Sequence, residues 1–197
     1  VQKNIQKKDL MIYERYFEIE EDFYKKDNGQ KLILNFGAVD AETKVYVNNV
    51  SVCHNIGGYL PFSADISDYV KSGKNTLTVH VSDPLDSNVP YGKQRKKRGG
   101  MWYTPVSGIW QTVWLEFVSE EYVKSYRVYP NIDDATLRID IKTNAENGKK
   151  AEIKAFYNGK EVGSAAATVS FGTATAILSL SELHLWEVGK PELYDLE

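Results

Sequence analysis

IWQTVWLEFV, residues 109–118, is the longest stretch of the chain with the character of a β-strand. Successive side chains of a strand point to opposite faces, so this stretch presents two sets of residues. They are Ile109, Val113, Leu115 and Phe117 on one face, and Trp110, Trp114 and Val118 on the other. Both sets are largely apolar, which is typical of a strand covered on both sides. We therefore expect this strand to be buried on both faces.

The segment just before this strand is rich in glycine and aromatic residues. Residues 99–108 read GGMWYTPVSG, and Ser107-Gly108 forms a turn signal at the start of the strand. Aromatic rings can lie against the apolar C–H face of a sugar while polar neighbours bind its hydroxyls. Trp102 and Tyr103 are therefore candidate substrate-binding residues. They are equally suited to closing the end of a sandwich or to packing against another domain.

A basic run, KQRKKR at residues 93–98, precedes the aromatic loop. Such a run alone is one signal of a nucleic-acid-binding patch. The chain as a whole, however, has a net charge of −3 and a pI near 5.7, and no wider basic face accompanies the run. We therefore interpret it as a mobile, solvated loop and expect no nucleic-acid partner.

Shorter strand candidates fill the chain upstream of this loop, with turn signals between them. Asn48-Asn49 tolerates positive φ and therefore suits a tight hairpin. Asn28-Gly29 and residues 72–75 provide further turns. The candidates are Tyr13–Ile19, Lys31–Phe36, Lys44–Val47, Val50–Cys53 and Thr76–Val81.

A second set of strand candidates follows Glu120. It comprises Ser125–Tyr129, Thr136–Ile141, Ala151–Tyr157 and Thr173–Leu180, with turn signals at Asn147-Gly148 and Asn158-Gly159. This spacing is typical of a small immunoglobulin-like sandwich. Helical periodicity is lacking, and only Ala64–Val70 suits a single helical turn. The sequence therefore predicts an all-β protein in two units, residues 1–119 and 120–197.

Composition narrows the classes of function. With 42% hydrophobic residues among 197, the chain can form proper cores. Cys53 is its single cysteine, so an intrachain disulfide and a cysteine-based zinc site are excluded. The longest apolar runs are too short to span a membrane, so we expect no membrane partner. The first residues have neither an initiating methionine nor a signal-peptide core, which is unlike a natural protein start.

The acidic residues and histidines do not form a catalytic or metal-binding motif. Acidic neighbours such as Asp133-Asp134 fall in predicted turns, whereas catalytic carboxyls normally have a pKa shifted by burial or a close partner. His54, His80 and His184 are far apart and lack the spacing of a metal or Ser/His/Asp site. His54 leads into a glycine-rich loop and is the one histidine that we consider for substrate binding. We predict no catalytic residue, metal or cofactor.

Taken in order, several motifs resemble the first two domains of glycoside hydrolase family 2, the β-galactosidase, β-glucuronidase and β-mannosidase family. The resemblance covers nearly the whole chain, and the order and spacing of the motifs make it specific. The motifs are Tyr13-Glu-Arg-Tyr-Phe17, Phe36-Gly-Ala-Val-Asp40 with Lys44-Val-Tyr-Val-Asn48, Gly57-Gly-Tyr-Leu-Pro-Phe62 with Asp65-Ile66, Gly73-Lys-Asn-Thr-Leu77, Ser107-Gly-Ile-Trp110 with Val113 and Leu115, and Leu185-Trp186 with Pro191-Glu-Leu-Tyr194.

The resemblance implies a jelly-roll-like, galactose-binding-type β-sandwich followed by an immunoglobulin-like β-sandwich. In the family these precede a catalytic (β/α)-barrel, which needs ~250 residues and carries two glutamates. The chain is too short to contain it, and it lacks the Asn-Glu dipeptide usual around the acid/base. The longer β-galactosidases have an aspartate before the Met-Trp pair where this chain has Gly100, which weakens a strict galactosidase assignment. Family members also usually have a further segment upstream of the Tyr13 strand.

Three functions are therefore compared. The preferred one is a non-catalytic fragment of a family 2 glycosidase, which supports its own catalytic barrel, shapes the cleft for a carbohydrate substrate and contributes to a homo-oligomer. The second is a stand-alone carbohydrate-binding module using Trp102 and Tyr103. The third is a structural adhesion module with protein partners only. The sequence does not indicate the sugar or the cellular compartment.

Overall fold

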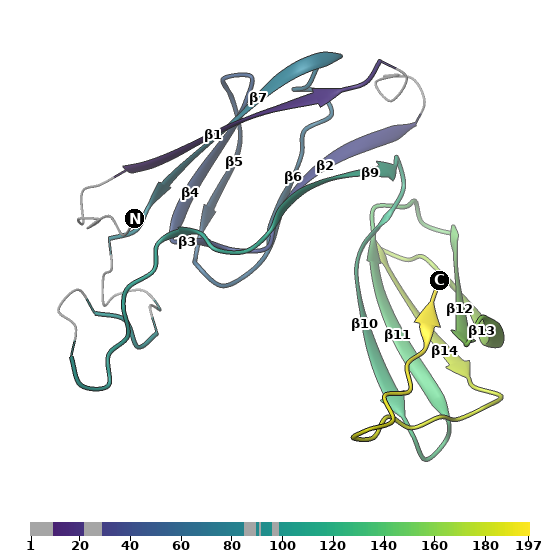
Figure 1. Cartoon of the computed structure of the whole chain (residues 1–197). Coiled ribbons are helices and arrows are strands. Elements are labelled where there is room, and N and C mark those ends of the chain that lie inside the picture. The colour runs from purple at the N-terminus through teal and green to yellow at the C-terminus, as the bar shows by residue number, and fades with distance from the viewer. Residues whose placement is uncertain (1–9, 22–28, 85–89, 91, 96–98) are drawn as a thin grey trace. The chain divides into compact units, whose positions relative to one another are not determined.

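The computed structural model describes residues 10–21, 29–84, 90, 92–95 and 99–197. The chain divides into two compact units, residues 1–120 and 121–197, and strands form the regular structure of both (Figure 1). Across the described residues there is no helix of the length and apolarity needed to cross a membrane. The all-β prediction is confirmed.

The first unit is a sandwich of two antiparallel sheets with a short ribbon at one end. One sheet has the order β1-β7-β4-β5, the other β6-β2-β9, and β3 pairs with β8 in the ribbon. The strands are β1 (Leu10–Ile19), β2 (Gln30–Phe36), β3 (Val39–Asp40), β4 (Glu42–Val47), β5 (Val50–Ile56), β6 (Phe62–Asp65), β7 (Gly73–Ser82), β8 (Gly108–Ile109) and β9 (Val113–Ser119).

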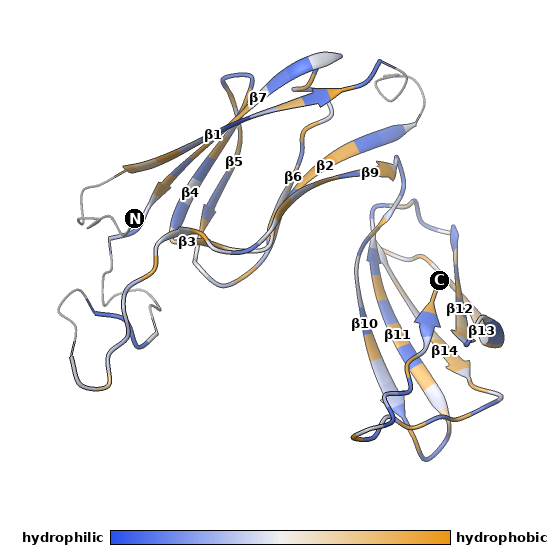
Figure 2. Ribbon diagram, in the orientation of Figure 1, coloured by the Kyte–Doolittle hydropathy of each residue, from blue (hydrophilic) through white to orange (hydrophobic). Residues whose placement is uncertain are grey.

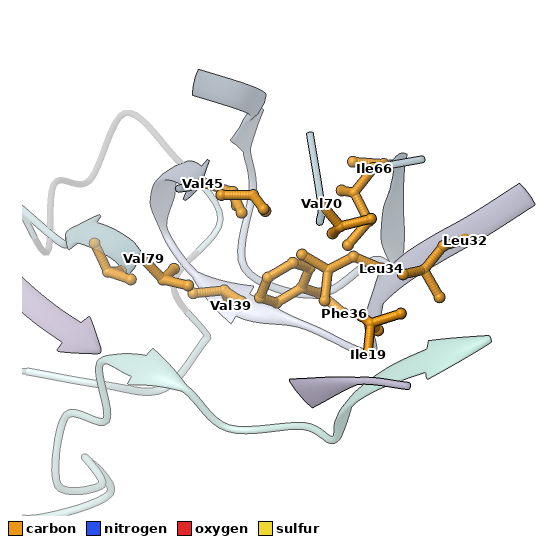
Figure 3. Close-up of a cluster of buried hydrophobic side chains, with 12 residues drawn as sticks. Ile19, Leu32, Leu34, Phe36, Val39, Val45, Ile66, Val70 and Val79 are labelled. Atoms are coloured by element: carbon orange, nitrogen blue, oxygen red, sulfur yellow. The ribbon is translucent and has the colours of Figure 1, made fainter. Parts of the chain in front are cut away.

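The core of the first unit lies between the two sheets. Leu34 and Phe36 of β2 are almost fully buried, and the Phe36 ring stacks on Phe62 with centroids 4.7 Å apart. Figure 3 shows Val45 and Val79 of the opposite sheet in the same cluster. Apolar side chains at alternate positions of these strands point inwards, so burial follows the two-residue period of the sequence.

Two local predictions for the first unit can be compared with the structure. Asn48 and Asn49 have φ values of 49° and 69° and connect β4 to β5, which confirms the hairpin. The helical turn expected at residues 64–70 is replaced by the end of β6 and one hydrogen-bonded turn, in which the Tyr69 N–H donates to the Ile66 carbonyl at 3.0 Å.

The prediction for residues 109–118 was wrong in two respects. The stretch is not one strand, because Ile109 pairs with β3 in the ribbon whereas β9 begins at Val113 and pairs with β2. It is also not covered on both sides, since Trp114 of one face and Leu115 of the other remain exposed. The physical reason is that β9 is the edge strand of its sheet, and an apolar sequence cannot specify whether a neighbour covers it.

The second unit is an immunoglobulin-like sandwich of two three-stranded sheets, as predicted. Their orders are β10-β11-β14 and β13-β12-β15. Hydrophobic and hydrophilic residues alternate along β11 (Figure 2), and its Ile139 and Ile141 pack in the core with Leu178. The strands are β10 (Val123–Asn131), β11 (Thr136–Thr143), β12 (Lys150–Tyr157), β13 (Lys160–Thr168), β14 (Thr173–Ser179) and β15 (Asp195–Leu196).

Candidate functional site

The β3–β8 ribbon forms the centre of the candidate site in the first unit. Asp40 of β3 pairs with Gly108 of β8. The turn between β5 and β6 lies against Asp40. A Cβ atom on Gly58 of this turn would stand 2.3 Å from Asp40 Oδ1, so only glycine permits the approach. The Tyr13 hydroxyl of β1 accepts a hydrogen bond from the Ile109 N–H at 3.4 Å. Residues from four separate parts of the sequence therefore meet at this end.

A pair of buried carboxyl groups lies within this site. Asp40 is 7% exposed and Asp83, which follows β7, is 4% exposed. The Ser107 hydroxyl donates a hydrogen bond to the Asp83 carboxylate. Burial, and to a lesser extent the charge of Asp83, raises the pKa of Asp40 to about 6. The sequence reasoning missed both residues, because no local pattern marks an aspartate as buried.

The raised pKa of Asp40 gives a testable pH dependence. A carboxyl that binds its proton more tightly in the folded state contributes stability below its unfolded pKa of about 4, and this stability is lost as the pH rises through about 6. We expect Asp40→Asn to raise the free energy of unfolding by about 1–2 kcal/mol at pH 7.5 and to have little effect at pH 4. Urea unfolding followed by tryptophan fluorescence measures this difference. Glu18→Gln, at an exposed carboxyl of the same unit, is the control; an equal gain at both pH values would contradict the prediction.

The aromatic loop is held by the basic run that precedes it. The Arg95 guanidinium lies 4.1 Å from the centre of the Trp102 ring, at cation–π distance. The Tyr103 N–H donates to the Lys93 carbonyl at 2.7 Å, and the Val106 N–H donates to Gln94 Oε1 at 2.5 Å. Residues 93–95 therefore contact the aromatic loop, which our interpretation of the basic run did not include. Residues 96–98 lie outside the described part of the chain.

The three candidate site residues differ in their surroundings. Trp102 is half-buried under Arg95, and Tyr103 beside it is 68% exposed. His54 lies in β5, where its Nε2 is 3.0 Å from Glu42 Oε1 of β4. Among the described residues, no hydrogen bond or ring contact joins His54 to either aromatic residue. Trp102 and Tyr103 therefore remain neighbours in one loop, whereas His54 lies in strand β5 and pairs with β4.

Two further aromatic residues at this end were not singled out from the sequence as site residues. Tyr59, in the turn beside Asp40, meets Trp110 edge to face with centroids 6.4 Å apart, and the Trp110 indole N–H donates to the Gly58 carbonyl at 2.8 Å. Both rings remain nearly half exposed. The Tyr59 hydroxyl lies 3.5 Å from the position of a Cβ on Gly92, so the long β7–β8 segment approaches this turn. Exposed aromatic faces beside polar groups suit stacking against a sugar ring.

Both units match sequence families. Residues 3–117 match the family described as "Glycosyl hydrolases family 2, sugar binding domain", and residues 121–197 match "Glycosyl hydrolases family 2". A putative β-glucuronidase of Formosa agariphila is 26% identical over 189 residues, covering 89% of this chain and 22% of the relative. A β-galactosidase of Thermoanaerobacter pseudethanolicus is 30% identical over 134 residues, covering 66% of this chain and 17% of the relative.

Solved structures agree on the fold. The β-glucuronidase of Bifidobacterium dentium superposes with a TM-score of 0.74 over 95% of this chain and 36% of that chain, at 20% identity. The two sandwiches and the sequence matches define the class of this chain, which is an all-β region of the kind found in carbohydrate-acting hydrolases. More particularly, the chain belongs to glycosyl hydrolase family 2. It spans 16–27% of the length of the curated relatives it matches.

Proposed function

We propose that this chain is the non-catalytic part of a longer family 2 enzyme that hydrolyses β-glycosidic bonds. Its first unit shapes one wall of the substrate cleft, and both units support the catalytic barrel. The observation that carries this proposal is that the two units match successive regions of one family. The chain, however, spans only about a fifth of the length of the Formosa agariphila relative. The names of the relatives, β-glucuronidase and β-galactosidase, indicate the class of substrate.

The buried aspartates support a structural role rather than a catalytic one. The two carboxyl groups of a glycosidase flank the scissile bond and must therefore touch the sugar. Asp40 and Asp83 are almost fully buried, so neither carboxyl is free to contact a pyranose ring from solvent. The position of Asp40 against Gly58 instead supports the turn that carries Tyr59 and, through the Gly58 carbonyl, the indole of Trp110. In the whole enzyme, Tyr59, Tyr103 and Trp110 are the residues that we propose to face the substrate.

Enzyme assays test the non-catalytic assignment. We expect the purified 197-residue chain to release no nitrophenol from nitrophenyl β-galactoside or β-glucuronide above the buffer rate, because on this proposal the two carboxylates needed for retaining hydrolysis belong to the catalytic barrel. Turnover that scales with protein concentration and persists through a further purification step would contradict the proposal. An intact family 2 β-glucuronidase serves as the positive control.

A stand-alone carbohydrate-binding module is the second candidate, because Tyr59, Tyr103 and Trp110 of the first unit expose aromatic side chains. It requires saturable binding of galactose, glucuronate or their methyl β-glycosides to the chain alone. This binding would be lost in Tyr103→Ala and Trp102→Ala while the fold persists. Calorimetric titration distinguishes the two functions, since the preferred proposal assigns the sugar contacts to the complete cleft.

A further inference from the structure

The outer face of the β10-β11-β14 sheet in the second unit carries an excess of positive charge. Residues of β11 alternate between the core and solvent, so Arg138, Asp140 and Lys142 lie together on the outer face. Arg127 of β10 lies directly opposite Asp140 in the sheet register, and Thr175 of β14 lies opposite it on the other side. Three cations therefore neighbour one carboxylate in the middle of a three-stranded face (Figure 1).

The carboxylate of this face is already bound by two neighbours. Arg138 Nη2 lies 3.3 Å from Asp140 Oδ2, and the Thr175 hydroxyl donates to Asp140 Oδ1 at 3.0 Å. Within the described part of the chain, neither Arg127 nor Lys142 has an ion-pair or hydrogen-bond partner for its charged group. These two cations are therefore available to an anionic ligand.

The outer face of the other sheet of this unit is balanced in charge. There Lys150 and Lys154 of β12 lie on either side of Glu152, and β13 adds Glu161. Two cations thus face two carboxylates. Because the whole chain has a net charge of −3, the positive charge of the β10-β11-β14 face is a local feature and does not follow from the composition.

The side chains of this face restrict what it can bind. Charged side chains are almost never fully buried unless they are paired, so a further domain of a longer chain is not expected to bury Arg127 and Lys142. The Arg138 guanidinium stacks on the Tyr129 ring, 4.2 Å from its centroid, and so competes with a nucleic-acid base for that ring. Ile177 is the exposed apolar residue, which is too little for a hydrophobic contact. The remaining outward positions carry hydroxyl or amide groups, which suit sugar hydroxyls: Ser125, Asn131, Thr136, Thr173, Thr175 and Ser179.

We infer that this face binds an acidic polysaccharide, whose uronic acid carboxylates pair with Arg127, Arg138 and Lys142. The inference rests on the proposed function, since an enzyme that hydrolyses glycosides acts on carbohydrate chains. The planar fork of an arginine matches a carboxylate in a bidentate manner, and the lysine adds a point charge. The hydroxyl side chains between the cations bind the hydroxyls of the sugar. Because the charges are exposed to solvent, binding weakens as the salt concentration rises.

Titration with a labelled oligogalacturonate tests this inference. Fluorescence anisotropy is measured at low salt with the whole 197-residue chain. We expect saturable binding that unlabelled polygalacturonate displaces and uncharged dextran does not. Arg127→Gln combined with Lys142→Gln should weaken binding about fivefold and make its salt dependence shallower. Both side chains are exposed, so this double variant should keep the fold, which circular dichroism checks.

Matched variants separate this face from the other charges of the chain. Lys150→Gln combined with Lys154→Gln removes the same charge from the opposite sheet and should change the affinity by no more than about twofold. Asp140→Asn removes the carboxylate that repels the ligand and should tighten binding by about twofold. Serine at Lys96 and Lys97 reduces the charge of the basic run and should leave the fivefold difference in place.

Four results would overturn the inference. They are equal affinity of the unsubstituted chain and the double variant at Arg127 and Lys142, an equal loss in the double variant at Lys150 and Lys154, no saturable binding up to about 1 mM, and tighter binding of a DNA oligonucleotide of the same charge. The nitrophenyl glycoside assay is independent of these results, so it tests the proposed function separately.

Discussion

Replacing Asn75 by alanine is expected to lower the free energy of unfolding of the first unit by about 3–5 kcal/mol. Asn75 is 1% exposed, and its side chain uses all of its hydrogen-bonding capacity. Oδ1 accepts from the Lys71 N–H at 2.9 Å and from Asn48 Nδ2 at 2.8 Å, and Nδ2 donates to the carbonyls of Lys71 and Gly73 at 2.7 and 2.9 Å. Truncation leaves these part-buried groups without partners, at ~1–3 kcal/mol each where water cannot replace them.

Urea unfolding measures this loss in a Trp186→Phe background, in which the remaining tryptophans all lie in the first unit. Asn75→Asp is the sharper variant. It keeps the oxygen that accepts from Lys71 and Asn48, but it replaces the donor Nδ2 by a charged oxygen that faces the carbonyls of Lys71 and Gly73. It should therefore be at least as destabilising as alanine at pH 7. Asn55→Ala is the matched control, since the Asn55 amide makes one exposed hydrogen bond, to the Gly57 carbonyl. A loss below about 1 kcal/mol for Asn75→Ala would show that the hydrogen bonds of the Asn75 side chain contribute little to the stability of the first unit.

Replacing Gly163 by valine is expected to destabilise the second unit by about 3 kcal/mol or more, since overpacking typically costs ~1–3 kcal/mol for smaller insertions. A Cβ atom on Gly163 would stand 2.4 Å from the Ser179 carbonyl oxygen and 2.5 Å from Leu178 Cδ1. The first of these is main chain, so β13 and β14 must move apart to accept any side chain. Leu178 is itself almost fully buried in the core of this unit.

Differential scanning calorimetry detects this change as a lower melting temperature for one of the transitions. Ala166→Val is the control, because Ala166 lies on the same strand with its side chain exposed, and valine favours the β conformation there. Ala166→Val should therefore have an effect within about 0.5 kcal/mol. Equal melting temperatures for Gly163→Val and the unsubstituted chain would contradict the close approach of β13 and β14.

How much of the fold was predictable depended on whether the signal was local. The β4–β5 hairpin was predicted from Asn48-Asn49, because tolerance of positive φ is a property of the residues themselves. Strand β13 was missed, although the turn before it at Asn158-Gly159 was recognised. Its sequence contains Gly163 and several alanines, which have low β propensity. Its position follows from pairing with β12 and from the close approach to β14, neither of which the strand's own residues encode.

The candidate site was predictable to a smaller extent. The loop of Trp102 and Tyr103 was recognised by its aromatic content, and its role in sugar binding stays a prediction. The contact between Arg95 and Trp102 was not foreseen, since the basic run and the aromatic loop were interpreted separately. Asp40 was also missed, because its burial depends on Gly58 and the β3–β8 ribbon, which come from distant parts of the chain.

The sequence by itself determined the all-β class, the main turns and the family resemblance, and even the alternating apolar character of residues 109–118. These features depend on the two-residue period of a strand and on residue-specific backbone preferences, which act over a few neighbouring residues. Only the tertiary structure decided that residues 109–118 are divided between a ribbon and an edge strand, that Leu115 is exposed, and that Asp40 is buried. Burial and edge position depend on which distant strands pair, and a strand of the same composition can occupy either place.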